Sequence, residues 1–268
     1  MTAMTDQDTE RLARIYSAQA KAYAETWGPI IRAAGARLLE RLPWPAVKRV
    51  VDIGTGAGVH LASIRRLAPD AWIVGVDRSP GMLELARPHG VPLAEMDGMS
   101  LAFRAQSFDV AVMIFVLFHL DDPAAALRGV RSILRPGGTL GCVTWAKDPD
   151  TEASQLWEAE LDALGARDPD PIPRRHEMMN TTEKMAGLLS SAGLRPATLW
   201  MEAIERDWTV DGLVALHTGF GRARRKLESL APEIRATFLA RIPRQLSELP
   251  SRAFRYRAST ICSVASVP

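Results

Sequence analysis

The chain has 268 residues, enough for one domain with added elements, and 47% of them are apolar, as in a globular core. The net charge of +2 gives no strong long-range field, so the composition argues against a nucleic-acid partner. Cys142 and Cys262 form no CxxC or zinc-type spacing, and we expect no metal site. Met1–Glu10 lacks the pattern of a signal peptide, and the longest apolar run, Val110–Leu120, is too short to span a bilayer. We therefore expect a reduced, cytoplasmic protein without a membrane partner.

Residues 1–45 are predicted to form a helical N-terminal lid. Apolar positions recur with helical spacing through Asp8–Leu42. Gly28 and Pro29 are expected to separate two helices, because proline suits the first position of a helix. Pro43 and Pro45 then end the segment.

Residues 46–148 alternate predicted strands with predicted helices. The strands are Arg49–Ile53, Trp72–Val76, Pro92–Met96, Phe108–Ile114 and Thr139–Trp145, and the helices are Val59–Leu67, one from Pro80 and Ala124–Leu134. This alternation is typical of a doubly wound parallel α/β sheet.

Residues 149–268 depart from this alternation. The predicted order is helix Ser154–Gly165, a proline-rich loop Arg167–Arg174, helix Thr181–Ala192, a strand from Gly193 to about Trp208, helices within Val210–Leu249, and a strand Phe254–Val264. We therefore expect a seven-stranded, mostly parallel sheet with its core in residues 46–148. Residues 149–268 would add helical substrate-cap insertions and the last two strands of the same sheet.

The strongest motif follows the first predicted strand, where Gly54, Gly56 and Gly58 precede a helix. Such a loop brings backbone close to a ligand and offers the amides of a helix N-terminus. A dinucleotide fingerprint places its third glycine at the sixth position of the motif, which is Val59 here. Asp52 would repel a pyrophosphate but attract a sulfonium and an ammonium group. The charge pattern therefore favours S-adenosylmethionine over a dinucleotide.

Two further acids follow predicted strands. Asp77 lies 23 residues after Gly54, at the end of the second strand, where a carboxylate can accept hydrogen bonds from ribose hydroxyls. Asp97 ends the third strand and is expected near the adenine. The carboxyl ends of adjacent parallel strands form the ligand-binding edge of such sheets.

These motifs together resemble those of class I S-adenosylmethionine-dependent methyltransferases of the small-molecule type. The resemblance covers Tyr16 to about Lys147, roughly half of the chain. It is carried by the segments VVDIGTGAG, GVDRSPGMLELAR, MDGMSLAFRAQSFDVAV and FVLFHLDDPAAALRGVRSILRPGGTL, with AKAYAETWGP resembling the N-terminal lid of such enzymes.

The resemblance implies a set of cofactor contacts and transfer of a methyl group to O, N or C of a small molecule. Asp52 would face the ammonium group, Asp77 the ribose, and Tyr23 the methionyl carboxylate. The full set is Tyr16, Tyr23, Asp52, Gly54, Thr55, Gly56, Gly58, Asp77, Arg78, Met82, Asp97, Gly98, Met99, Met113, Ile114 and Phe115.

No catalytic group is assigned from the sequence. His119 follows the predicted cofactor floor, and His176 and His217 lie in the C-terminal region, but each is more often structural than a base. Many relatives have a polar residue where Ile114 stands, which leaves open a protein of this fold that binds the cofactor without transferring the methyl group. An NAD-dependent oxidoreductase is the third alternative, and Val59 argues against it.

Residues 222–257 hold ten basic residues and three acidic ones. This excess is compatible with an anionic substrate or partner, but a solvated helix face explains it better. No aromatic-rich basic motif supports RNA binding. These patterns leave open whether the protein forms a homodimer.

Overall fold

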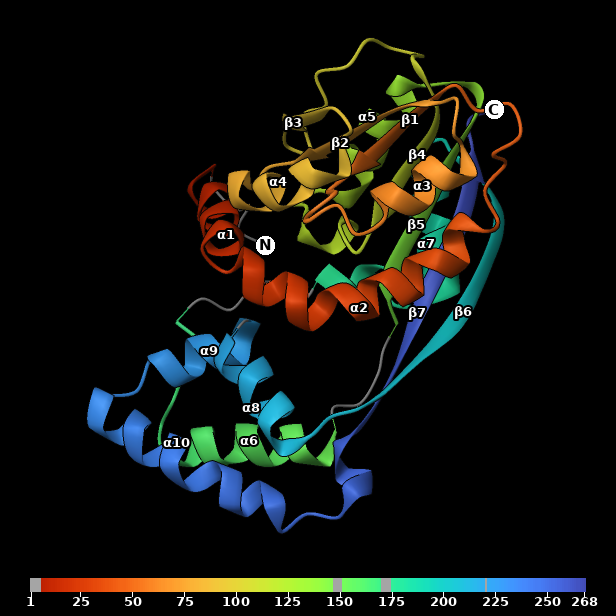
Figure 1. Cartoon of the computed structure of the whole chain (residues 1–268). Coiled ribbons are helices and arrows are strands. Elements are labelled where there is room, and N and C mark those ends of the chain that lie inside the picture. Colours follow the sequence, from red (N-terminus) through yellow and green to blue (C-terminus); the bar gives the residue numbers. More distant parts are fainter. Residues whose placement is uncertain (1–5, 147–150, 170–174, 220) are drawn as a thin grey trace. The chain divides into compact units, whose positions relative to one another are not determined.

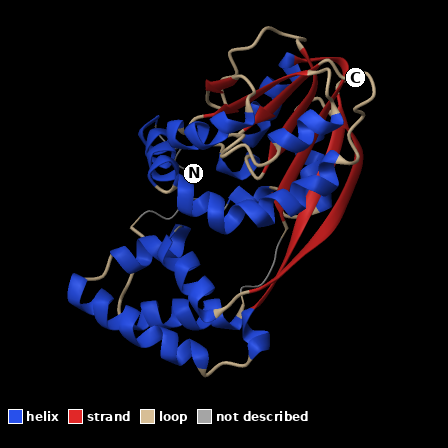
Figure 2. Cartoon of the chain, viewed as in Figure 1, coloured by secondary structure: helices blue, strands red, loops and turns tan. Residues whose placement is uncertain are grey.

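The computed structural model describes residues 6–146, 151–169, 175–219 and 221–268, and in these its strands form one sheet (Figures 1 and 2). The seven strands are β1 (Arg49–Ile53), β2 (Trp72–Asp77), β3 (Leu93–Glu95), β4 (Phe108–Ile114), β5 (Leu134–Trp145), β6 (Arg195–Asp207) and β7 (Arg255–Ser266). Their order is β3-β2-β1-β4-β5-β7-β6. Strands β1 to β5 run parallel and β7 is antiparallel to β5. The predicted mostly parallel, seven-stranded fold is confirmed.

The strand order reverses at β1, which pairs with β2 on one side and β4 on the other. Connections leave these two neighbours in opposite directions, so a crevice opens at the carboxyl ends of β1 and β4. All seven residues of β4 are buried, as expected for a central parallel strand covered on both faces. The crevice therefore lies above the most buried part of the sheet.

Short helices cover both faces of the sheet. They are α3 (Leu61–Leu67), α4 (Pro80–Ala86), α5 (Pro123–Ile133) and α7 (Thr182–Ser191), with 3₁₀ turns η1 (Arg87–His89), η2 (Leu117–His119) and η3 (Arg175–Met178). Ser79, Asp122 and Thr181 cap the starts of α4, α5 and α7 by accepting a backbone hydrogen bond. In Figure 1, α3 and α4 lie on one face and α5 on the other.

The N-terminal segment forms α1 (Asp6–Ala18) and α2 (Ala20–Leu39). The predicted break at Gly28 and Pro29 is wrong, because α2 continues through Pro29 and the chain bends at Gln19 instead, with φ −114° and ψ 10°. Gly28 has no Cβ to collide with the proline ring, which removes part of the usual conflict inside a helix. Helix α2 packs against β5, α3 and α4.

The chain divides into two compact units. The first comprises residues up to 147, 175–202 and 259–268, and the second comprises 148–174 and 203–258. The domain limits predicted from the sequence, at 45 and 148, stay predictions. Of the predicted loop Arg167–Arg174, residues 170–174 lie outside the part that the structure describes.

The second unit is helical, with α6 (Glu152–Ala163), α8 (Val210–Gly219), α9 (Gly221–Glu228), α10 (Pro232–Ser247) and the turn η4 (Ser251–Phe254). Trp157 and Phe238 pack edge to face at its centre, with ring centroids 4.9 Å apart. The basic residues of this unit are largely neutralised. Eight of the ten in residues 222–257 lie within 4 Å of a carboxylate, and these are Arg222, Arg224, Arg225, Lys226, Arg241, Arg244, Arg255 and Arg257. This pairing argues against a basic binding surface, although the side chain of Lys226 is buried and that of Arg225 is largely buried against their partners rather than solvated.

Both cysteines are free and buried, and burial raises the pKa of each thiol to about 12. Within the described ranges, no group of His, Cys, Asp and Glu has the arrangement of a metal site. Across those same residues, no helix combines the length and the apolar character needed to cross a membrane.

Candidate functional site

The glycine loop connects β1 to α3 and adopts a conformation that other residues rarely take. Gly54, Gly56 and Gly58 have φ values of 68°, 54° and 75°. The amides of Gly54 and Thr55 both donate to the carbonyl oxygen of Val76, at 2.7 and 2.9 Å, which holds the loop against the end of β2. A side chain on Gly56 would project into open space. The loop therefore presents bare backbone to whatever occupies the crevice.

Asp52 lies at the end of β1, below this loop, and is only 2% exposed. Its Oδ2 accepts a hydrogen bond from the Thr55 hydroxyl at 2.7 Å. Burial raises the pKa of Asp52 to about 7, a shift that the Thr55 hydrogen bond opposes and the charge of Asp77 increases. A buried carboxylate so shifted is suited to a cationic ligand, which would restore its ionised form.

Asp77 ends β2 and is held by two backbone amides. Its Oδ2 accepts from the Gly56 amide and its Oδ1 from the Ser79 amide, each at 2.9 Å. Burial raises the pKa of Asp77, while these hydrogen bonds and Arg78 lower it. Burial, reinforced by Asp77, raises the pKa of Tyr23, so its hydroxyl remains a hydrogen-bond donor.

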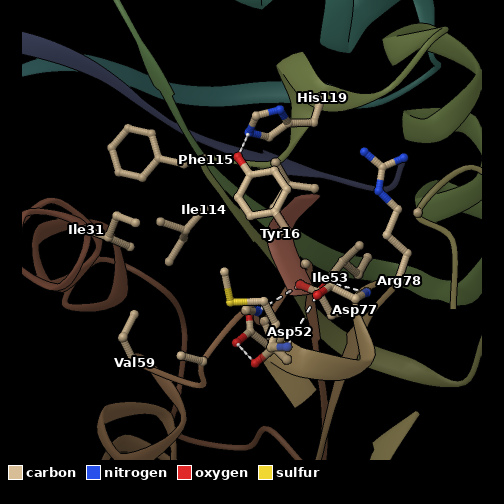
Figure 3. A pocket seen from close by; sticks show the side chains of 18 of the residues that line it. Tyr16, Ile31, Asp52, Ile53, Val59, Asp77, Arg78, Ile114, Phe115 and His119 are labelled. Atoms are coloured by element: carbon tan, nitrogen blue, oxygen red, sulfur yellow. Dashed lines mark hydrogen bonds between the residues drawn. The ribbon is translucent and has the colours of Figure 1, made fainter. Parts of the chain in front are cut away.

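One pocket of about 970 Å³, open solvent included, contains both carboxylates and the glycine loop (Figure 3). Twelve of the sixteen predicted cofactor residues line it: Tyr16, Tyr23, Asp52, Gly54, Thr55, Gly56, Asp77, Arg78, Met82, Gly98, Ile114 and Phe115.

The other four predicted residues do not line the pocket. Met113 is buried in β4, one position before Ile114, and a side chain on Gly58 would meet His89 and Ala86. Asp97 and Met99 lie together in the turn after β3, where the Met99 amide donates to the Asp97 carboxylate at 2.8 Å. Their proposed contacts with a cofactor stay predictions.

A polar pair forms another wall of the pocket. The Tyr16 hydroxyl, from α1, lies 3.1 Å from Nε2 of His119, at the end of η2 (Figure 3). The Tyr16 ring also packs edge to face against Tyr23, with centroids 5.4 Å apart. Residues 103 positions apart in the chain thus form one hydrogen-bonded unit facing the cavity.

Apolar side chains line the rest of the pocket. Phe115 follows β4 with φ of 57°, which is unusual for a residue other than glycine and is a feature of functional sites. The centroid of its ring lies 4.3 Å from that of Trp145, and the centroid of the Trp145 ring lies 5.8 Å from that of Trp27. The end of β4 and the end of β5 thus share an aromatic cluster beside the pocket.

Several lining residues were not predicted from the sequence. They are Ala13, Ala24, Gly28, Ile31, Ile53, Ala57, Val59, His60, Ser79, Met96, Val116 and Leu120, in addition to His119. Ala24, Gly28 and Ile31 recur at helical spacing, so one face of α2 carried a signal for them. His60 carried none. Burial first, and then the charge of Arg32, lower its pKa to about 4.

The other two histidines considered as bases in the sequence analysis, His176 and His217, have structural surroundings. The His176 ring packs at a tilt against that of Phe118, with centroids 4.1 Å apart, and burial lowers the pKa of His176. In the second unit, the His217 ring packs at a tilt against that of Trp157, with centroids 5.0 Å apart, and its Nε2 lies 3.2 Å from the Ser154 hydroxyl. Neither lines the pocket of the first unit.

Comparison with known proteins places the chain in a family. The sequence model described as "Methyltransferase domain" matches residues 24–198. The demethylmenaquinone methyltransferase of Corynebacterium kroppenstedtii is 29% identical over 81% of this chain and 96% of that protein. The ubiquinone biosynthesis O-methyltransferase of a Ruegeria species is 30% identical over 62% of this chain and 72% of that protein.

Solved structures share the fold at low identity. The 1,6-didemethyltoxoflavin-N1-methyltransferase of Burkholderia thailandensis has a TM-score of 0.57 and 15% identity, covering 100% of this chain and 92% of that one. The [4+2]-cyclase SpnF has a TM-score of 0.54 and 20% identity, covering 88% and 80%. The fold is therefore also used by an enzyme named for a different reaction.

Proposed function

The chain belongs to the class I S-adenosylmethionine-dependent methyltransferases, and we propose that it binds this cofactor in the pocket of the first unit and methylates a small molecule there. The observation that carries the proposal is the convergence of Asp52, Asp77 and the glycine loop on one cavity. The family and its relatives' names argue against the NAD-dependent alternative.

The residues of the pocket fit the chemical groups of this cofactor. Asp52 would face the ammonium group, because a buried carboxylate is stabilised by a nearby cation. Asp77 would accept hydrogen bonds from the ribose, and its two backbone partners hold it in place for that role. Tyr23 would donate to the methionyl carboxylate. When bound, the cofactor supplies an electrophilic methyl group on a sulfonium.

The remaining predicted contacts follow the same arrangement. Arg78 and Met82 would lie beside the ribose and adenine, and Gly98, with Asp97 and Met99, beside the other side of the adenine. Ile114 and Phe115 would form the floor, with Met113 behind it. Gly58 would act through the packing of the loop rather than by direct contact.

The acceptor would be oriented by the aromatic and polar walls near Phe115, Tyr16 and His119. An O–H or acidic C–H acceptor must lose a proton as it gains the methyl group, and Nε2 of His119 is the basic atom on this wall that we propose receives it. The acceptor would replace the Tyr16 hydroxyl at Nε2, while the Tyr16 ring, packed edge to face on the imidazole with centroids 5.5 Å apart, would keep the imidazole in place. Relatives named for quinone precursors make phenolic and enolic molecules the first acceptors to try.

Calorimetry tests the cofactor assignment directly. We expect S-adenosylmethionine to bind and NAD not to bind, and we expect Asp77→Asn to weaken binding at least tenfold. Asp70→Asn, on the exposed loop after α3, is the matched control and should bind normally. Unchanged affinity in Asp77→Asn would contradict the placement of the ribose.

A labelled-methyl assay then tests the transfer. The acceptor panel should contain demethylated quinone precursors, simple phenols and small amines, with product mass measured for each. Transfer to amines alone would exclude the phenolic and enolic class. Cofactor binding with no transfer to any member would favour a cofactor-binding protein without transferase activity toward these classes.

A further inference from the structure

The last turn of α1 approaches the first turn of α4 more closely than any side chain at the contact would permit. A Cβ on Gly81 would lie 2.7 Å from the carbonyl oxygen of Ser17 and 2.8 Å from its Cα. Both are backbone atoms, so they cannot rotate away as the end of a long side chain could. Gly81 is therefore required here for the close approach of two helices.

Polar contacts reinforce this approach. The Gly81 amide donates to Oγ of Ser17 at 3.3 Å, and the hydroxyls of Ser17 and Ser79 share a hydrogen bond at 2.8 Å. Ser79 also accepts from the Met82 amide as the cap of α4, while its own amide donates to Asp77. A continuous set of hydrogen bonds thus connects α1 to the carboxylate at the end of β2.

The same turn of α1 supplies part of the pocket. Tyr16 precedes Ser17, and both Tyr16 and Ala13 line the cavity. Among the described residues, α4 is the main packing partner of α1, followed by α2. The α1–α4 contact is therefore positioned to decide where the Tyr16 hydroxyl lies.

We propose that Gly81 is a positioning residue, which lets α1 dock on α4 and thereby holds Tyr16 beside His119 in the pocket. The inference rests on the proposed function for its effect on cofactor binding, but the docking itself does not. Any larger residue at position 81 must separate the two helices, and the least costly way is for α1, at the edge of the unit, to move. Tyr16 would then leave the pocket.

Limited trypsin digestion measures the docking without any ligand. Arg11 and Arg14 are exposed on α1, and a protease must unwind the helix to cleave beside them. We expect Gly81→Ala to increase the rate of cleavage at these sites about tenfold. The matched control is Gly187→Ala in α7, where an added Cβ meets nothing within 4 Å. Its rate should equal that of the unaltered protein.

Ser17→Ala provides a second variant that adds no volume. It removes the hydrogen bonds to Gly81 and Ser79, and we expect about a threefold faster cleavage of α1. This variant keeps the test decisive if Gly81→Ala does not fold. Unchanged cleavage in Ser17→Ala and in a folded Gly81→Ala protein would overturn the proposal.

Cofactor affinity gives the second readout, in a double-mutant cycle with Tyr16. Gly81→Ala should weaken S-adenosylmethionine binding about tenfold in the unaltered background and much less in Tyr16→Ala, because the position of Tyr16 is what the substitution disturbs. If the losses of affinity in Gly81→Ala and Tyr16→Ala were additive in the double variant, Gly81 would not act through the position of Tyr16. If the unaltered protein does not bind the cofactor, the proposed function fails while the proteolysis result still decides the docking.

Discussion

Asp52 combines deep burial with a single side-chain hydrogen bond, from Thr55. In the ligand-free protein its pKa of about 7 lies above the usual value, so the folded state holds the proton more tightly than the unfolded state does. Its contribution to stability is therefore lost as pH rises from about 4 to 7. A cationic ligand reverses the preference, because it favours the carboxylate.

Binding of S-adenosylmethionine should release a proton from Asp52 at pH 6. The affinity should rise with pH up to about 7 and then level off, because binding below that value must first ionise the carboxylate. Calorimetry in buffers of different ionisation enthalpy measures the proton released. Asp52→Asn should bind more weakly and release none by this route. Equal proton release in the variant would contradict the assignment.

His119 and Tyr16 give a second test at the same scale. For an acceptor that loses a proton, His119→Ala should lower kcat by about 10²–10⁴-fold with a smaller change in the KM for the cofactor. Tyr16→Phe keeps the ring and removes the hydroxyl that lies 3.1 Å from Nε2, so a smaller loss is expected. Initial rates as a function of pH measure both. An unchanged pH profile in His119→Ala would rule it out as the base.

At the scale of elements, α6 and α9 are joined by charges rather than by apolar residues alone. Nζ of Lys226 lies 2.7 Å from Glu158 and 2.6 Å from Asp162, and the lysine side chain is only 2% exposed. The two carboxylates are more accessible, at 21% and 63%. A buried lysine needs such partners, because an unpaired charge in the core is strongly unfavourable.

Lys226→Ala should lower the free energy of unfolding by about 2–3 kcal/mol. This lies below the ~3–5 kcal/mol for breaking a fully buried pair, because water can reach the two carboxylates. Arg244→Ala is the control, since both partners in that pair are largely exposed and should contribute less than about 0.5 kcal/mol. Denaturant unfolding followed by circular dichroism compares the two. Equal losses would show that the buried pair contributes no more than an exposed one.

At the scale of the whole molecule, ligand binding and folding are linked through the first unit. A ligand that binds only the folded state stabilises it by about 2.7 kcal/mol at a concentration of 100 Kd. The pocket is formed by residues from α1, α2 and the carboxyl ends of three strands, so it exists only when these elements are assembled. Cofactor binding should therefore report on the fold of this unit.

S-adenosylmethionine at 100 Kd should raise the unfolding midpoint of the first unit by about 5–10 °C. Scanning calorimetry with and without the ligand measures the shift, and NAD should give none. In Asp77→Asn the same ligand concentration should produce a smaller shift. An equal shift with NAD would contradict the specificity inferred from Asp52 and Val59.

The sequence by itself determined the elements and the cofactor side of the site. Periodicity and glycine punctuation are local signals, and they predicted the loop at Gly54–Gly58, the acid at the end of β2 and the strand limits to within two residues, except that β5 begins at Leu134 rather than at Thr139. The family resemblance in those segments agrees with the matched domain at residues 24–198. Local signals failed at Pro29, where packing of α2 overrode the usual preference of proline.

Only the tertiary structure decided which distant residues meet. The pairing of Tyr16 with His119, the contact of Gly81 with Ser17 and the burial of Lys226 all join residues more than 60 positions apart. Such contacts depend on how helices pack on the sheet and on each other, and periodicity along the chain carries no information about them. The sequence therefore identified a nucleotide-type pocket, whereas packing determined what forms its opposite wall.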